Sequence, residues 1–166
     1  MPEAHVIQRY SRRRADGVWI DAMEPTELAR ACAAKMWEVD QTSRSFGMTL
    51  EAVGPGVASV SMTVRPDMSN NHGACHGGVI FTLADSAFAY ACNSYDAVTV
   101  AQHCSITFLV AGKVGDTLTA KAREAQRTGR SGVYDITVTR QDGVAIAEFR
   151  GLSRTTGGSF LAQRGG

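Results

Sequence analysis

One stretch of the chain, residues 70–92, constrains its fold more than any other. It opens with the polar, glycine-rich sequence Asn-Asn-His-Gly-Ala-Cys-His-Gly-Gly and continues into residues 79–92, where only Thr82, Asp85 and Ser86 interrupt a run of apolar side chains. A helix that is apolar almost all the way round is a buried helix. At 166 residues the chain is one domain by size. The rest of that domain must therefore wrap around this helix.

Asp85 lies in the middle of the apolar run. A carboxylate in a buried helix is costly unless it is paired, protonated or used in chemistry. No Lys or Arg occurs between Arg65 and Lys113, so no neighbour in the sequence neutralises it. Asp85 is the first candidate catalytic residue; the alternative is a buried acid that only bonds nearby hydroxyl groups. The second candidate is the helix start, where Gly77 and Gly78 leave backbone N–H groups open to developing negative charge.

Apolar periodicity gives the order of the remaining elements. A stripe at helical spacing begins after Pro25 and continues to about Val39, which predicts an N-terminal helix. Alternating apolar residues predict strands over 46–52, 58–64, 98–108, 117–126, 132–140 and 144–154. A helix that buries all its faces and strands that bury one face fit together as an antiparallel sheet around a single helix. The fold class predicted from periodicity is therefore α+β.

The motif Asn70, His76-Gly77-Gly78 and Leu83-Ala84-Asp85 resembles the acyl-CoA thioesterases of the hotdog fold. The likeness is closest to their phenylacetate-degradation branch, which acts on phenylacetyl or hydroxyphenylacetyl groups, and it covers about residues 40–158. It implies an antiparallel sheet wrapped around one long buried helix, preceded here by an extra N-terminal helix.

This resemblance sets the expected domain boundaries. Residues 25–158 form the hotdog domain. Residues 1–24 form an N-terminal extension that is either flexible or docked on a neighbour, and residues 159–166 form a C-terminal tail.

The resemblance also implies a role for three residues. Asp85 acts as general base or nucleophile, the Gly77 N–H donates to the oxyanion, and the Asn70 side chain helps to place the attacking water or the thioester. Some relatives carry a Ser or Thr on the following strand to assist the water. This chain has Ala101 there.

Further residues are candidate substrate contacts. His76 and Gly78 flank the proposed oxyanion donor, although a histidine in such a loop more often orders the backbone. Phe81, Leu83, Phe88 and Tyr90 are expected to meet the acyl group. The candidate contacts for the CoA phosphates are Arg127, Arg130, Arg150 and Arg154. Exposed arginines are more often only solvated.

The spacing of Gly77 and Asp85 predicts an assembly. Eight residues separate them, which is roughly 12 Å along a helix at 1.5 Å per residue. One carbonyl cannot lie about 3 Å from both groups. If both act, they come from different subunits, and the protein is a homodimer with shared active sites and antiparallel helices. The resemblance adds that such dimers commonly pair into homotetramers.

Composition excludes several other classes. A formal net charge of +1 gives no reason to expect nucleic acid or an anionic membrane as partner. Four cysteines without a CxxC pair favour a reduced, cytoplasmic chain. The N-terminus shows no secretory h-region, and no apolar stretch approaches the roughly 20 residues of a membrane span. We expect a soluble protein.

Other chemistries find little support in the sequence. GxSxG, P-loop and GxGxxG motifs are absent, so no cofactor is expected beyond the coenzyme A that belongs to the substrate. His72, Cys75 and His76 are spaced as zinc ligands could be, yet they lie in a glycine-rich loop without a second ligand cluster, and no metal is predicted. Cys75 beside His76 could instead be a thiol nucleophile.

Two alternative functions remain open at this level. A hydratase or dehydratase of the same fold would need a histidine with an acid, which His76 or His103 could supply. A non-catalytic acyl-CoA binding module would be expected to lack the helix acid, whereas Asp85 is present.

Overall fold

The structure is a computed structural model that describes residues 12–13, 19–20 and 23–162. The predicted extension, residues 1–24, lies mostly outside this range. In the described part of this extension, β1 (Arg12–Arg13) pairs antiparallel with β2 (Trp19–Ile20). The domain then runs α1 (Pro25–Val39), α2 (Gln41–Ser45), β3 (Thr49–Gly54), β4 (Val57–Thr63), the 3-10 turn η1 (Pro66–Met68), α3 (Gly77–Cys92), β5 (Thr99–Phe108), β6 (Thr117–Thr128), β7 (Ser131–Arg140) and β8 (Ala145–Thr155).

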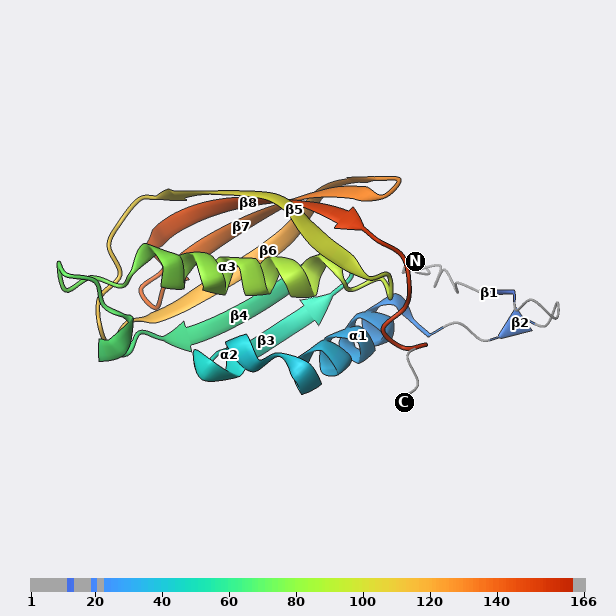
Figure 1. Ribbon diagram of the computed structural model, residues 1–166, viewed down its shortest axis with the longest axis horizontal. Helices are drawn as coiled ribbons and strands as arrows, with labels where there is room; N and C mark the ends of the chain where they lie inside the picture. The colour runs from blue at the N-terminus through green and yellow to red at the C-terminus, as the bar shows by residue number, and fades with distance from the viewer. Residues whose placement is uncertain (1–11, 14–18, 21–22, 163–166) are drawn as a thin grey trace, which may run out of the picture.

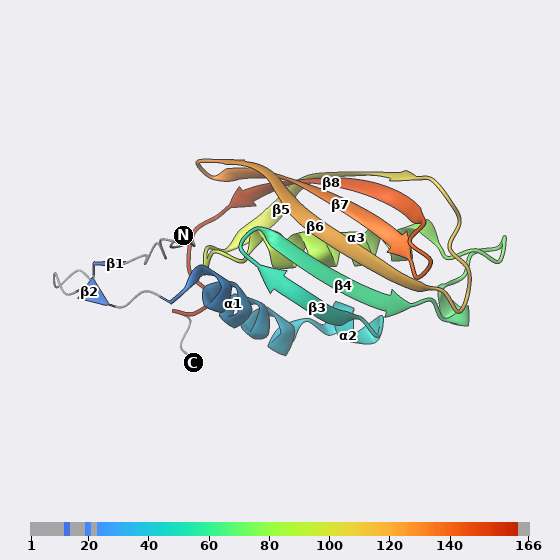
Figure 2. The ribbon, with the colours of Figure 1, turned by 180° about the vertical axis from the view of Figure 1, so that it is seen from behind.

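The six strands β3 to β8 form one antiparallel sheet in the order β3-β4-β6-β7-β8-β5. Helix α3 lies along one face of this sheet (Figure 1). Seen from behind, the other face carries none of the described helices, and α1 lies beside the edge strand β3 (Figure 2). The predicted α+β architecture, an antiparallel sheet around one long helix with an extra N-terminal helix, is confirmed. None of the described helices has the length and apolar character needed to cross a membrane.

Helix α3 is held against the sheet by side chains at three- and four-residue spacing. Leu83, Ala84 and Ala87 are fully buried, and the Phe88 ring packs against Tyr134 with 5.4 Å between ring centroids. Gly151 of β8 permits this approach, because a Cβ there would lie 2.8 Å from Phe88 Cζ. The sheet does not cover the whole helix. A stripe of small and polar residues stays partly exposed, formed by Gly78, Thr82, Asp85, Ser86 and Ala89.

Strand β5 contains a β-bulge. Its pairing with β8 shifts register between Ala101 and His103. A bulge places two residues of one strand opposite a single residue of its partner. Beyond the bulge, each side chain therefore points to the face opposite to the one that simple alternation predicts. Thr99 is accordingly buried before the bulge, whereas Cys104 and Ile106 are the partly buried residues after it. The bulge therefore decides which β5 side chains meet α3.

The end of the chain is fastened to the loop after α3. Asp96, at a left-handed φ of 54°, accepts hydrogen bonds from the Ser159 hydroxyl at 2.7 and 2.9 Å and from the Leu161 N–H at 3.0 Å. The Val98 N–H donates to the Gly158 carbonyl at 3.3 Å. The first part of the predicted C-terminal tail is thus bonded to the domain.

Candidate active site

The start of α3 is capped by a histidine from the glycine-rich motif. His76 is the N-cap residue, and its Nδ1 accepts a hydrogen bond from the Gly78 N–H at 2.9 Å. Because Nδ1 is the acceptor, the proton of the neutral ring is on Nε2. Among the hydrogen bonds of residues 23–162, none uses the Gly77 N–H as donor. Of the two glycines, Gly77 presents the open amide at the positive end of the helix dipole.

Asn70 orders the loop that leads to this helix start. Its side-chain oxygen accepts from the backbone N–H groups of His72 and Ala74, at 2.9 and 3.1 Å. The loop is anchored at its end as well, because the Cys75 N–H donates to the Gly112 carbonyl at 2.8 Å. The Asn70 oxygen is thus used by the loop, and its NH₂ group is the part left to bind water or substrate.

Asp85 lies two turns further along α3, within the partly exposed stripe. Burial raises the pKa of this carboxyl, and a hydrogen bond from the Cys104 thiol, with Sγ 3.9 Å from Oδ1, lowers it by less. No salt bridge joins Asp85 to a cation in the described part of the chain. An uncompensated carboxylate of raised basicity is suited to accept a proton from water.

Two residues at this site were not predicted from the sequence. They are Cys104 and Phe108, and both lie on β5. A Cβ at Gly77 would lie 3.0 Å from Phe108 Cζ, so the Phe108 ring stands directly against the helix start. That ring is 50% exposed. The available signal was the alternation of apolar residues over 98–108, which predicted a strand there but not that Cys104 and Phe108 lie beside Asp85 and Gly77.

The predicted acyl contacts on α3 are separated by the structure. Leu83, Phe88 and Tyr90 are fully buried, so their side chains are not open to a substrate in this structure. Phe81 is partly buried, and its ring meets Phe149 edge-on at 5.2 Å. The sequence shows an apolar helix but not which of its faces the sheet covers.

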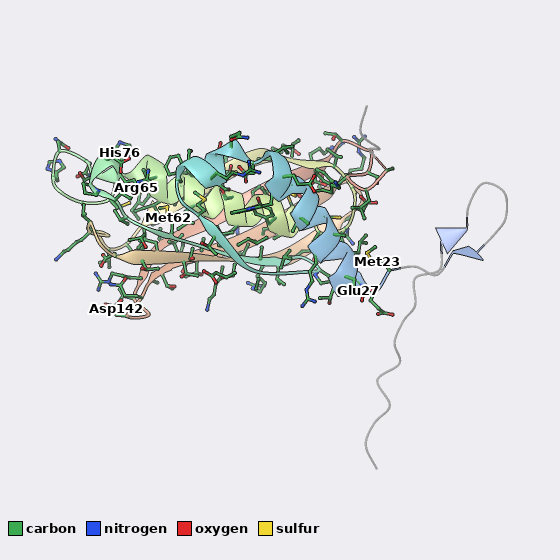
Figure 3. The ribbon with its side chains drawn as sticks, turned by 90° about the horizontal axis from the view of Figure 1, so that it is seen from below. Met23, Glu27, Met62, Arg65, His76 and Asp142 are labelled. Carbon is green, nitrogen blue, oxygen red and sulfur yellow. The ribbon has the colours of Figure 1, made fainter. Side chains whose placement is uncertain are left out.

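The predicted phosphate contacts Arg127 and Arg130 lie at the other end of α3 within the same chain. The Arg127 guanidinium lies 3.7 Å above the ring of Tyr95, which follows the C-terminus of α3. Arg130 Nε donates to the Thr155 carbonyl at 2.8 Å. One chain alone does not bring these arginines to Gly77. Figure 3 shows the length involved, with His76 at one end of the domain and Glu27 at the other.

The geometry gives no support to a thiol nucleophile or a metal site. Burial, with a smaller contribution from Asp116, raises the pKa of Cys75 to about 11, so its thiol is protonated at neutral pH. Across residues 12–13, 19–20 and 23–162, no three His, Cys, Asp or Glu side chains are grouped so that they could hold a metal ion.

A sheet around a helix that carries an open N-terminal amide and a basic carboxylate is suited to hydrolysis at an activated carbonyl. Comparison with known proteins supports this chemistry. The family described as the thioesterase superfamily matches residues 72–147. The chain is 44% identical over 131 residues to the acyl-coenzyme A thioesterase PaaI of Escherichia coli, covering 79% of this chain and 94% of that protein. The chain belongs to the thioesterase superfamily and is a thioester hydrolase.

Solved structures show the same relationship. The E. coli PaaI protein from the phenylacetic acid degradation operon superposes with a TM-score of 0.80 at 43% identity, over 81% of this chain and 97% of that one. A hypothetical thioesterase from Streptococcus pneumoniae, solved with coenzyme A, has a TM-score of 0.65 at 28% identity, covering 68% of this chain and 90% of that one. A Streptococcus mutans protein bound to acetyl CoA has a TM-score of 0.65 at 30% identity, with the same two coverages.

Proposed function

We propose that this protein hydrolyses acyl-CoA thioesters to the free acid and coenzyme A, with arylacetyl esters such as phenylacetyl-CoA and hydroxyphenylacetyl-CoA as preferred substrates. The observation that carries the proposal is the placement on α3 of an open Gly77 N–H and an Asp85 carboxylate that no described cation neutralises. The substrate class is supported by the name of the E. coli relative and by the coenzyme A and acetyl CoA in the two streptococcal structures.

The proposed mechanism starts at Gly77. The thioester carbonyl oxygen accepts a hydrogen bond from the Gly77 N–H, and the helix dipole stabilises the oxyanion that develops there. Asp85 either removes a proton from water that attacks the carbonyl carbon, or attacks that carbon itself to form a mixed anhydride that water then hydrolyses. In both routes the carbon–sulfur bond breaks, and the CoA thiolate leaves and is protonated. The Asn70 NH₂ group orients the water.

The two groups must come from two subunits. They are separated on α3 by roughly 12 Å, so we infer a homodimer in which Asp85 of the partner subunit faces Gly77. The small residues of the exposed α3 stripe would let a second helix approach closely. Strand β5 ends the sheet and offers a free edge, and four apolar side chains on it and the loop that follows are exposed: Val100, Phe108, Leu109 and Val110.

The proposed assembly would bring the remaining candidate contacts to the same site. With the two helices antiparallel, the C-terminal end of the partner's α3 lies toward Gly77. The partner's Arg127 and Arg130 then approach the same site and can bind the CoA phosphates. Pairing of two such dimers would give the tetramer that the family resemblance implies.

The arylacetyl preference is supported by Phe108. Its half-exposed ring stands beside Gly77, where the acyl group of a bound thioester begins. Aromatic rings attract one another in offset or edge-on contacts worth about 0.5–1.5 kcal/mol beyond their buried area. A phenyl group on the acyl chain would gain this contact, whereas an acetyl group would not.

The test is release of free CoA by the purified 166-residue protein from a panel of arylacetyl, short-chain and long-chain CoA esters. We expect the highest kcat/KM with the arylacetyl esters. Replacing Phe108 by Ala should reduce this preference, whereas Leu109→Ala, at an equally exposed neighbour, should not. If no ester releases CoA, the thioesterase proposal is wrong. Loss of enoyl-CoA absorbance without free thiol would identify a hydratase, and binding without turnover a binding module.

A further inference from the structure

The Asp85 carboxylate accepts a hydrogen bond from a thiol. Cys104 Sγ lies 3.9 Å from Asp85 Oδ1, and no other side-chain donor to Asp85 is found in residues 23–162. Cys104 lies just beyond the bulge between Ala101 and His103, after which Cys104 and Ile106 are the partly buried residues of β5. The contact is therefore set by the backbone of two different elements.

The Cys104 thiol is protonated, as a hydrogen-bond donor must be. Burial raises the pKa of Cys104 to about 11, and the negative charge of Asp85 contributes to that rise. The thiol therefore stays protonated at neutral pH and can donate to the carboxylate. An S–H group is a weak donor, so it can fix the direction of a carboxylate while leaving its oxygens basic. A hydroxyl at the same place would bind more strongly and withdraw basicity.

Within residues 23–162, no other side chain donates to Asp85 in competition with this thiol. Cys92 is the other described titratable group that interacts with the Asp85 charge, and burial raises its pKa to about 12, so it too is protonated. The strands packed beneath α3 present uncharged core side chains, among them Val60, Met62, Leu118, Ile136, Val138 and Phe149.

We propose that Cys104 is a positioning residue for the reaction, whose S–H group orients the Asp85 carboxylate toward water or substrate while preserving its ability to accept a proton. This inference rests on the proposed function, since it assigns Asp85 the catalytic role. It adds a residue that acts through Asp85 and does not itself touch the reacting atoms.

Two variants separate orientation from basicity. Cys104→Ser keeps a donor and strengthens it, so the acid limb of the kcat/KM profile should move to lower pH. Cys104→Ala removes the donor, so that limb should move to higher pH, and kcat should fall about tenfold with KM nearly unchanged, as expected for loss of one orienting hydrogen bond. Cys32→Ala, which removes a buried thiol of α1, is the control and should leave the profile in place.

A second readout is independent of turnover. Carboxyl ¹³C NMR of the folded protein, with the Asp85 signal assigned by its absence in Asp85→Asn, gives the titration of Asp85 directly. We expect it to move down in Cys104→Ser and up in Cys104→Ala. If the wild-type protein releases no CoA but these titrations move, the proposed function is wrong and the contact is real. If neither the titration nor the acid limb moves in either variant, Cys104 has no such role.

Discussion

The His76 ring and the Gly78 N–H are hydrogen-bonded at 2.9 Å, and this bond closes the first turn of α3. Its consequence lies at the residue between them. With Gly78 occupied, the Gly77 N–H is the amide that remains open at the helix start. The histidine of the motif thus determines which backbone group can bind a substrate oxygen.

Gly77→Pro should lower kcat about 10²- to 10³-fold, the usual effect of removing one oxyanion donor. The first helical position tolerates proline, and His76 already has the extended backbone, φ −62° and ψ 134°, that a residue before proline prefers. Gly77→Ala is the matched control, because it crowds Phe108 equally but keeps the N–H, and it should retain most of the activity. Equal activity of the two variants would remove the Gly77 amide from the mechanism.

Asp85→Asn should cost about 10²-fold or more in kcat while CoA-ester binding persists, because the amide has the shape of the carboxylate but cannot accept the proton. Steady-state kinetics and isothermal calorimetry measure the two quantities. Glu27→Gln is the control, an exposed acid of α1 at the far end of the domain (Figure 3). A variant with near-normal turnover would show that another group activates the water.

The same substitution should stabilise the folded protein at neutral pH. The pKa of Asp85 is raised on folding by burial, so the folded state holds its proton to higher pH than the unfolded state, whose carboxyl titrates near about 3.9. The free energy of unfolding of the wild type therefore decreases as pH rises through the folded pKa. The Asp85→Asn variant lacks this decrease, because an amide does not titrate. Urea unfolding should find Asp85→Asn more stable at pH 7 and no such advantage near pH 3. An advantage that is constant across this range would contradict the titration argument.

The proposed sharing of the active site between two subunits predicts complementation between two inactive chains. A hybrid dimer of one Asp85→Asn subunit and one Gly77→Pro subunit contains one site with both lesions and one site with neither. Its activity should approach half that of the wild type. The hybrid is made by co-expression with two different tags and isolated with both, because obligate dimers exchange subunits slowly if at all. A folded hybrid without activity would place both groups in one chain.

The order of the helices and strands could be predicted because hydrophobic periodicity carries it. Residues 25–39 were predicted as a helix and form α1 with those bounds, and residues 79–92 lie within α3. The bulge at Ala101 and His103 could not be predicted, since an inserted strand residue leaves composition unchanged and only its pairing partner reveals it.

Parts of the candidate site that lie in one sequence motif could be proposed from the sequence, whereas contacts made by pairing of distant elements could not. Asp85 and Gly77 stood out through a charge in an apolar helix and a glycine start. Cys104 did not, because a single cysteine in an alternating strand has the pattern of an ordinary core residue. The burial of Leu83 could not be predicted either, since a helix apolar on every side gives no sign of which side the sheet covers.

The bonds that Asp96 forms with Ser159 and Leu161 bear on how the chain can be modified. An affinity tag or fusion partner that replaces residues 156–162 would remove the donors that bond to the Asp96 carboxylate. The Asp96 backbone would still have a left-handed φ of 54°. The loop that follows α3 would then lose its support. Tags for the hybrid dimer should begin beyond residue 162, so that the fastening of the chain end is preserved in both subunits.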